Sequence, residues 1–282
     1  MIRIIESPRE GMQGFARIIP TDEKVRYINH LLRVGFDTVE IGSIVSPRVI
    51  PQMADSLVVL KKLDLSGTSS KLMFLAVHAR GAEILSGVDA ITHISYPFSF
   101  SPTFLKLNVS STVEQSLETT NIVTNLCHKT RKHPVIYISM AFGNPYGDAW
   151  SIEILTKWVS KLHDSGARII PLSNVSTEID AAMISRVYST LIPMFPDIEF
   201  GLHLHTSNQG WYEKVQGAYL AGCRRFDGVI NGLGGCPMAG KEMLGNLKTE
   251  NLIAFAENKK IPVQIDQRML MKAYKAAGEI FF

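Results

Sequence analysis

Residues 199–206 read E-F-G-L-H-L-H-T, a short and largely apolar run that carries two histidines two positions apart near its end. Seven other short runs are rich in Ile, Val and Phe and are flanked by Gly, Pro, Ser or Asp. They are Arg3–Glu6, Thr38–Gly42, Leu72–Val77, Ala90–Tyr96, Val135–Phe142, Arg168–Leu172 and Phe226–Asn231. Such runs are typical of strands that are buried on both faces of a parallel sheet. The sequence therefore predicts eight parallel strands, of which Glu199–Thr206 is the seventh.

Amphipathic segments separate these predicted strands. Thr21–Val34 and Ser151–Ser165 both carry aliphatic residues at helical spacing on one face. Strands that alternate with helices over this length match an α/β fold of the (β/α)8 TIM barrel type, for which about 250 residues is usual. An open doubly wound sheet is the alternative. However, Ser7–Gly11 reads S-P-R-E-G, and no G-x-G-x-x-G turn follows the first strand.

No linker-like run rich in Ser, Gly or Pro and no low-complexity segment interrupts the 282 residues. We therefore expect residues 1–282 to form a single TIM-barrel domain with its active site at the C-terminal mouth. The least regular segment, Pro97–Val109, is expected to be a long loop after the fourth strand. Long loops at that end of a barrel usually carry function.

The composition excludes several classes of protein. A hydrophobic share of 46%, a charged share of 20% and a mean hydropathy of +0.10 indicate a globular chain rather than a disordered one. No apolar stretch of about 18 residues and no signal-peptide pattern is present, so we expect neither a membrane span nor export. Three cysteines at unrelated spacings predict a reducing compartment, and a net charge of +3 gives no reason to expect nucleic-acid binding. We expect a cytoplasmic enzyme that acts on a small molecule.

Polar side chains gather at the predicted C-terminal ends of the strands. In a TIM barrel these ends surround one mouth, so a polar residue there is a candidate for catalysis. The candidates are Glu6, Arg9, Glu10, Glu40, His203, His205, Asn231 and Asn246.

His203 and His205 are the most informative pair. Residues two apart on a strand point to the same side, so both imidazoles are expected to face the barrel mouth. Two imidazoles with carboxylate and amide oxygens suit Mg, Mn or another divalent metal, and the lack of thiolates argues against a structural zinc site. The alternative is that one or both histidines form hydrogen bonds in the barrel core.

Two further residues have both a functional and a structural interpretation. Cys236 lies in a Gly-rich segment, where it could act as an acid, a base or a nucleophile, or be a buried apolar residue. Arg9 could stabilise a developing enolate or carboxylate oxygen, or simply form an ion pair with Glu10 or Glu40.

Four motifs spread along the chain resemble one enzyme family. Ser7–Gln13 (S-P-R-E-G-M-Q) is similar to P-R-D-G-L-Q, and Glu40–Asp55 to E-A-T-S-F-V-S-P-K-W-V-P-Q-M-A-D. Gly143–Tyr146 (G-N-P-Y) is similar to G-C-P-Y, and Gly232–Pro237 (G-L-G-G-C-P) with Gly245–Leu247 to a signature loop. These motifs belong to the hydroxymethylglutaryl-CoA lyases, within the metal-dependent aldol and Claisen (DRE-TIM metallolyase) barrels. The Gly-Gly-Cys-Pro loop distinguishes the lyases from the related synthases.

The resemblance implies a set of site residues. The implied ligands of a divalent metal, Mg or Mn, are Glu10, His203, His205 and Asn246. The implied catalytic residues are Arg9, Glu40, His203 and Cys236. In these roles Arg9 would steady an enolate, Cys236 would act as acid and base, and Glu40 would support the site.

The implied reaction is retro-aldol cleavage of 3-hydroxy-3-methylglutaryl-CoA, or of a related 3-hydroxyacyl substrate, to a ketone and an enolate-derived product. The substrate would be an acyl-CoA, with the CoA thioester as part of it, or a hydroxy acid. The resemblance further implies a homodimer.

Acidic positions of the family differ in this chain. Glu10 stands in place of Asp, and Thr206 stands where Asp follows the second histidine. P-L-S-N at Pro171–Asn174 stands where the family has L-G-D-T, so the acid expected there is replaced by Ser173. Two alternatives therefore remain open. One is a Claisen-type condensing enzyme that joins an acyl-CoA to a 2-keto acid, and the other is a catalytically inactive barrel with a binding role.

Overall fold

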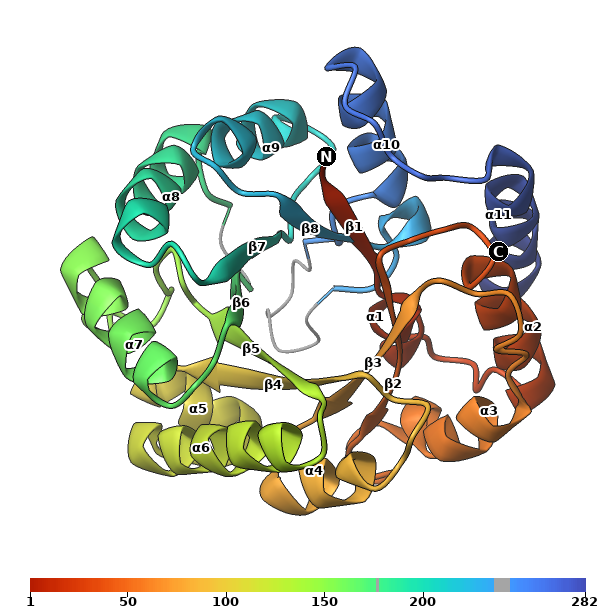
Figure 1. The fold of residues 1–282 in the computed structure, drawn as a ribbon, viewed down its shortest axis with the longest axis horizontal. Coiled ribbons are helices and arrows are strands. Elements are labelled where there is room, and N and C mark those ends of the chain that lie inside the picture. Colours follow the sequence, from red (N-terminus) through yellow and green to blue (C-terminus); the bar gives the residue numbers. More distant parts are fainter. Residues whose placement is uncertain (176–177, 236–243) are drawn as a thin grey trace.

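The computed structural model describes residues 1–175, 178–235 and 244–282. Its strands are β1 (Arg3–Glu6), β2 (Thr38–Ile44), β3 (Lys71–Ala76), β4 (His93–Ser99), β5 (His133–Ser139), β6 (Ile169–Ser173), β7 (Glu199–His203) and β8 (Arg225–Gly228). They close into one barrel in the order β1 to β8, and all neighbouring pairs are parallel (Figure 1). The predicted (β/α)8 TIM barrel is confirmed.

Helices surround the barrel (Figure 1). The α-helices are α1 (Pro8–Gln13), α2 (Thr21–Leu31), α3 (Ser56–Lys62), α4 (Ala79–Ser86), α5 (Pro102–Val109), α6 (Val113–Lys129), α7 (Ile152–Asp164), α8 (Ala181–Met194), α9 (Trp211–Leu220), α10 (Thr249–Asn258) and α11 (Gln267–Phe281). Two short 3-10 helices are η1 (Pro51–Met53) and η2 (Ile230–Gly232).

The segment predicted to be a long loop, Pro97–Val109, is instead regular over most of its length. β4 continues to Ser99, and α5 occupies Pro102–Val109. The Ser101 side chain accepts a hydrogen bond from Phe104 N and so caps the helix. Pro102 is tolerated in the first turn because its missing N–H would have had no partner within the helix.

Several strands end earlier than the sequence predicts. β7 ends at His203 and β8 at Gly228, and their pairing ends at His203 opposite Asp227. Beyond β8 the chain turns into η2, where Asn231 has a φ of 61°. That left-handed conformation is incompatible with a strand, so Asn231 lies beyond β8 rather than on it.

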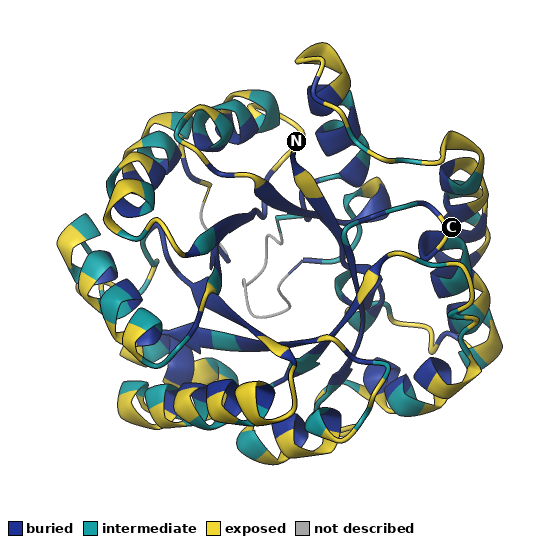
Figure 2. Ribbon diagram, viewed as in Figure 1, coloured by how far each residue is buried: buried dark blue, intermediate teal, exposed yellow. Residues whose placement is uncertain are grey.

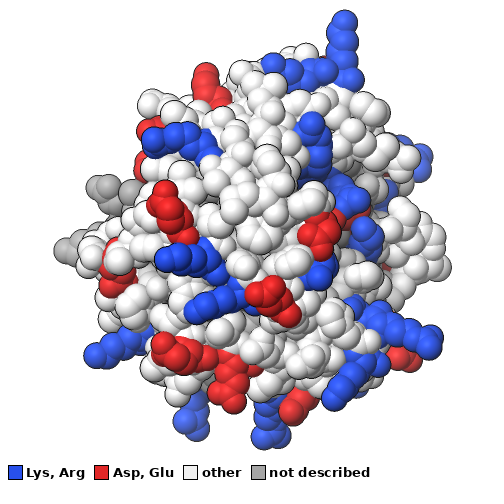
Figure 3. All heavy atoms as spheres, turned by 60° about the vertical axis from the view of Figure 1, so that its left-hand side comes forward, with Lys and Arg blue, Asp and Glu red and all other residues white. Residues whose placement is uncertain are grey.

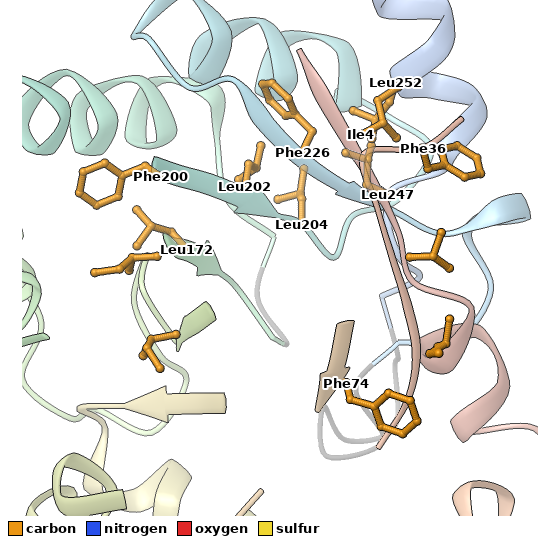
Figure 4. Packing of buried hydrophobic residues seen from close by; sticks show 14 of the residues in the cluster. Ile4, Phe36, Phe74, Leu172, Phe200, Leu202, Leu204, Phe226, Leu247 and Leu252 are labelled. Carbon is orange, nitrogen blue, oxygen red and sulfur yellow. The ribbon is translucent and has the colours of Figure 1, made fainter. Parts of the chain in front are cut away.

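Successive side chains of β1 point to opposite sides of the barrel wall, as strand geometry requires. Ile4 belongs to a large apolar cluster of strand and helix residues, part of which is drawn in Figure 4. Ile5 packs in a second cluster with Met73, Val135 and Tyr137, which come from β3 and β5. Side chains from alternate strands therefore share one layer inside the barrel, which is the packing expected of this fold.

The surface agrees with a folded barrel whose helices are amphipathic. Figure 2 shows strands that are mostly buried and helices that expose their outward sides. On the face drawn in Figure 3, Lys and Arg are interspersed with Asp and Glu. None of the helices in the described ranges is long and apolar enough to span a membrane.

Candidate metal centre

A cluster of metal-binding side chains forms where β7 ends beside α1. One ligand atom each from Glu10, His203 and His205 lies within 4.8 Å of the others. The centroids of the His203 and His205 rings are 5.1 Å apart, which agrees with the expectation that both side chains point to the same side. The structure thus brings together three of the four residues expected to bind a metal.

Glu10 uses its two carboxylate oxygens differently. Oε1 accepts a hydrogen bond of 2.8 Å from Arg9 Nη2. Oε2 lies 3.1 Å from His203 Nε2. It is buried and has no hydrogen bond of good geometry to any part of the chain that the structure describes. A buried carboxylate oxygen so close to an imidazole nitrogen is well placed to share a cation with it.

The charges in this cluster are strongly coupled. Burial disfavours a charged His203, but the Glu10 carboxylate and the hydrogen bond to Asp227 outweigh it and raise the pKa of His203 to about 10. Burial and the charge of His203 lower the pKa of His205 to about 4. Burial also works against the Glu10 carboxylate, yet His203 and Arg9 hold its pKa well below the usual range. The Glu10 carboxylate therefore stabilises positive charge at His203, while burial and His203 disfavour positive charge at His205.

Arg9 is held on several sides. Its Nε donates to Glu40 Oε2 over 2.8 Å, and its Nη1 donates to Gln13 Oε1 over 2.8 Å. The other oxygen of Glu40 accepts from Ser95 Oγ over 3.0 Å. The ion pairs with Glu10 and Glu40 that the sequence left as an alternative are both present. They also fix a buried cation beside the metal-binding cluster.

His205 lies two residues beyond the end of β7 and is held there by Asn174. The Asn174 side chain accepts from His205 N over 2.8 Å and donates to His205 O over 2.7 Å. His205 Nδ1 lies 2.8 Å from Asn174 O, a carbonyl that can only accept. Nδ1 therefore carries the proton in the neutral ring, and Nε2 keeps the lone pair for a metal.

Ser173, where the resemblance expects an acid, donates from its hydroxyl to the Asn174 carbonyl oxygen, which also lies 2.8 Å from His205 Nδ1. The next residue, Asn174, is 2% exposed. Its amide both donates and accepts, which a carboxylate cannot do. Ser173 is also the register partner of His203 on the neighbouring strand.

Asn246 is connected to the cluster through its backbone and its amide. It forms an isolated bridge with His205, and its Nδ2 donates to Leu233 O over 2.7 Å. A Cβ on Gly234 would lie 2.2 Å from Glu10 O and 3.3 Å from Asn246 Nδ2, so only glycine fits between them. The hydrogen bond to Leu233 O involves only the amide nitrogen of Asn246. The amide oxygen, which is the atom with which Asn binds metals, takes no part in that contact.

Thr206 has a carboxylate beside it despite the change from Asp. Lys214 Nζ donates to Thr206 Oγ1 over 2.8 Å and forms an ion pair with Glu178. Glu178 Oε1 also accepts from Ser207 N over 2.7 Å. Glu178 therefore supplies, from the connection after β6, an acid next to the position where the family carries one.

Glu6 does not join this site, contrary to the expectation that it lies at the mouth. Because Ile5 points into the barrel, Glu6 points outward. It accepts hydrogen bonds from Ile230 N and Thr249 Oγ1 and is completely buried. Cys236, the expected acid and base, lies outside the described residues.

The donor set fits a divalent metal. It combines one carboxylate, two imidazoles and a neighbouring amide, and the cluster within the described ranges contains no thiolate. Such mixed nitrogen and oxygen sites suit Mg, Mn and similar ions, although they do not distinguish among them. The buried Glu10 Oε2, with no hydrogen bond from the described residues, is the atom that a cation would satisfy.

The sequence did not single out Asp227 and Tyr137, which lie inside the barrel next to His203. Asp227 Oδ2 is 3.1 Å from His203 Nδ1 and accepts a hydrogen bond of 2.6 Å from Tyr137 Oη. The available signal was a charged residue within a run predicted to be buried on both faces, since strand interiors rarely hold one without a partner.

Comparison with known proteins agrees with the fold and the site. The HMGL-like family model matches residues 2–276. Hydroxymethylglutaryl-CoA lyase from Bacillus subtilis is 29% identical over 269 residues, covering 95% of this chain and 89% of that protein. (R)-citramalyl-CoA lyase from Chloroflexus aurantiacus is 28% identical over 277 residues, covering 95% of this chain and 86% of that protein.

A solved structure of similar extent is that of an HMG-CoA lyase from Acinetobacter baumannii in complex with coenzyme A and 3-methylmalate. It superposes with a TM-score of 0.90 at 26% identity and covers 100% of this chain and 91% of its own. The family model and these whole-length similarities to carbon–carbon lyases lead to one conclusion. This chain belongs to the HMGL-like family and is an enzyme of the carbon–carbon lyase kind.

Proposed function

We propose that this protein is a divalent-metal-dependent lyase that cleaves a 3-hydroxyacyl-CoA by a retro-aldol reaction, with 3-hydroxy-3-methylglutaryl-CoA as the first substrate to test. The observation that carries the proposal is the convergence of Glu10, His203 and His205 within 4.8 Å, next to the buried cation Arg9. Retro-aldol chemistry needs a group that acidifies a hydroxyl and a cation beside a developing enolate, and both features occur here.

Glu10, His203, His205 and Asn246 would hold the metal. A divalent ion there would act as a Lewis acid on the substrate hydroxyl and orient the substrate. Arg9 is fixed by Glu10, Glu40 and Gln13, so it can face a developing oxyanion without first being reorganised.

The reaction balances in two proton transfers and one bond cleavage. A base takes the proton of the tertiary hydroxyl, and the carbon–carbon bond breaks as the hydroxyl carbon becomes a ketone. The electron pair of that bond passes into the enolate of the thioester product, whose oxygen Arg9 stabilises. The enolate carbon then takes up a proton, and we assign the acid–base role to Cys236 because of the matching G-L-G-G-C-P segment.

The relatives support a CoA thioester of a hydroxy acid as the substrate class. One acts on hydroxymethylglutaryl-CoA and another on citramalyl-CoA, and the Acinetobacter protein was solved with coenzyme A and 3-methylmalate. Hydroxymethylglutaryl-CoA and citramalyl-CoA differ in the acyl group joined to CoA. Assaying both therefore tests the same cleavage reaction on two acyl groups of different shape.

The test uses the whole chain, stripped with EDTA and reloaded with Mg²⁺ or Mn²⁺. Hydroxymethylglutaryl-CoA and citramalyl-CoA are supplied separately, and thioester and keto-acid products are followed by chromatography. Metal-dependent cleavage of either substrate supports the proposal. Metal binding without cleavage of either one, or condensation of acetyl-CoA with a 2-keto acid instead, would overturn it.

Four further expectations belong to this proposal. We propose that Mg or Mn is the native metal, that residues 1–282 act as one domain, that the enzyme is cytoplasmic and that it forms a homodimer. Exposed apolar side chains on and after α11, Met271 at 63% and Phe282 at 87%, offer area for a partner copy. Size-exclusion chromatography with light scattering tests the dimer, and a mass of 31.3 kDa would contradict it.

A further inference from the structure

Asp227 lies directly behind the histidine that faces Glu10. His203 has Nε2 at 3.1 Å from Glu10 Oε2 and Nδ1 at 3.1 Å from Asp227 Oδ2. The two ring nitrogens therefore face two different carboxylates, one on the metal-binding side and one inside the barrel. The Asp227 side chain is 1% exposed, so water does not compete for this contact.

The barrel register creates this arrangement. His203 on β7 and Asp227 on β8 are register partners, and Asp227 is also the register partner of the inward-facing Ile5 on β1. Partners on neighbouring parallel strands project to the same side of the sheet. The contact therefore follows from the closed barrel itself and does not depend on a loop.

The same carboxylate oxygen is held by a second donor. Tyr137 Oη on β5 donates to Asp227 Oδ2 over 2.6 Å, and the Tyr137 ring meets the His203 ring edge-on at 5.4 Å between centroids. Tyr137 thus fixes the carboxylate and also restricts the rotation of the imidazole.

A buried cation lies on the other side of Asp227. Arg225 Nε is 3.9 Å from Asp227 Oδ1, and Arg225 is 1% exposed. Gly201 makes room for it, because a Cβ there would lie 2.9 Å from Arg225 Cδ and 3.2 Å from Pro171 Cβ. Arg225 therefore places a positive charge beside the Asp227 carboxylate, while the other carboxylate oxygen faces His203 and Tyr137.

We propose that Asp227 is a positioning residue for the metal centre: it takes the Nδ1 proton of His203 in a hydrogen bond, with Tyr137 fixing it, so that Nε2 is presented to the metal. The inference rests on the metal site of the proposed function. Carboxylates that accept from a metal-binding histidine set its tautomer and orientation, and their loss typically lowers metal affinity by about 10- to 100-fold.

The experiment measures Mn²⁺ affinity rather than turnover. EDTA-stripped protein is titrated with Mn²⁺, and free Mn²⁺ is followed by electron paramagnetic resonance. The variants are Asp227→Asn and Tyr137→Phe. The matched control is Tyr188→Phe, which also removes a buried hydroxyl donating over 2.6 Å, but to Gly201 O and not to Asp227. Circular dichroism and urea unfolding confirm that each variant is folded.

We expect Asp227→Asn to weaken Mn²⁺ binding by about 10- to 100-fold and Tyr137→Phe by about 3- to 10-fold, with Tyr188→Phe within twofold of the wild type. The inference is overturned if both site variants bind Mn²⁺ within twofold of the wild type, or if Tyr188→Phe weakens binding as much as Tyr137→Phe. If Asp227→Asn does not fold, the comparison of the two tyrosine variants decides the question. A wild-type protein that binds no Mn²⁺ would instead refute the proposed metal site.

Discussion

The buried carboxyl of Glu6 should make the stability of the barrel depend on pH in a specific direction. Burial, only partly offset by hydrogen bonds from Thr249 and Ile230, raises the pKa of Glu6 from 4.5 to about 8. Between these two values the folded protein keeps the proton that the unfolded chain has released. Folding therefore takes up a proton at Glu6, so the Glu6 contribution to stability is fully present below pH 4.5 and is lost as the pH rises to about 8.

The perturbation is Glu6→Gln, which keeps the shape of the side chain and removes the titration. The amide oxygen can still accept from Ile230 N, and the amide nitrogen can donate to Thr249 Oγ1. Each pH unit in this window costs the wild type about 1.4 kcal/mol. The variant should therefore gain about 3 kcal/mol over the wild type between pH 5 and pH 7.5.

The assay is urea unfolding of both proteins, metal-free, at half-unit pH steps from 5 to 8. The difference in free energy of unfolding cancels the other titrating groups, which the two proteins share. Glu257→Gln, at an exposed position of α10, controls for the loss of one negative charge. A difference between Glu6→Gln and wild type that stays constant from pH 5 to pH 8 would refute the reasoning.

Three shorter predictions concern the site and its support. Asn174→Asp should lower the free energy of unfolding by about 2 kcal/mol at pH 7.5, because a carboxylate oxygen replaces the donor 2.7 Å from His205 O. An unchanged urea midpoint would contradict a stabilising role for the two hydrogen bonds between Asn174 and the His205 backbone. Gly201→Ala should cost about 1–3 kcal/mol, because its Cβ would lie 2.9 Å from Arg225 Cδ; thermal unfolding checks this, and an unshifted Tm would count against the tight fit. Arg9→Lys should lower kcat/KM for cleavage about 100-fold, because an ammonium cannot reproduce the fixed guanidinium contacts; a loss below threefold at saturating Mn²⁺ would rule out its role.

The barrel could be predicted because its main signal is local. Runs buried on both faces alternate with amphipathic segments, and no long-range contact is needed to recognise either. The helix Pro102–Val109 was missed because its start depends on one Ser101 cap, whose effect is not visible in a hydrophobic pattern. The strand ends were missed for a related reason, since they depend on where pairing with a neighbour stops.

The site was partly predictable on the same grounds. The two-residue spacing of His203 and His205 survives even though β7 ends between them. The expectation that Glu6 lies at the mouth is wrong because either Ile5 or Glu6 could face into the barrel. The hydrophobic pattern does not decide between these two adjacent residues. The contact between Asp227 and Tyr137 joins residues 90 positions apart in sequence. Only the closure and register of the barrel bring them together, so a strand-by-strand interpretation could not find it.

The acidic positions that differ from the family decide between a working site and a barrel that has lost its chemistry. Glu10 is one methylene longer than Asp, yet its two oxygens still reach both Arg9 and His203. Next to Ser173, where the expected acid is missing, the Asn174 amide both donates to and accepts from the backbone of His205.

Beside Thr206, the ion pair of Glu178 with Lys214 restores a carboxylate from a different loop. Glu10 and the two imidazoles still converge within 4.8 Å, and the buried Glu10 Oε2 is free of other hydrogen bonds from the described residues. This arrangement agrees with the proposed metal site rather than with a barrel that has lost its metal-binding side chains.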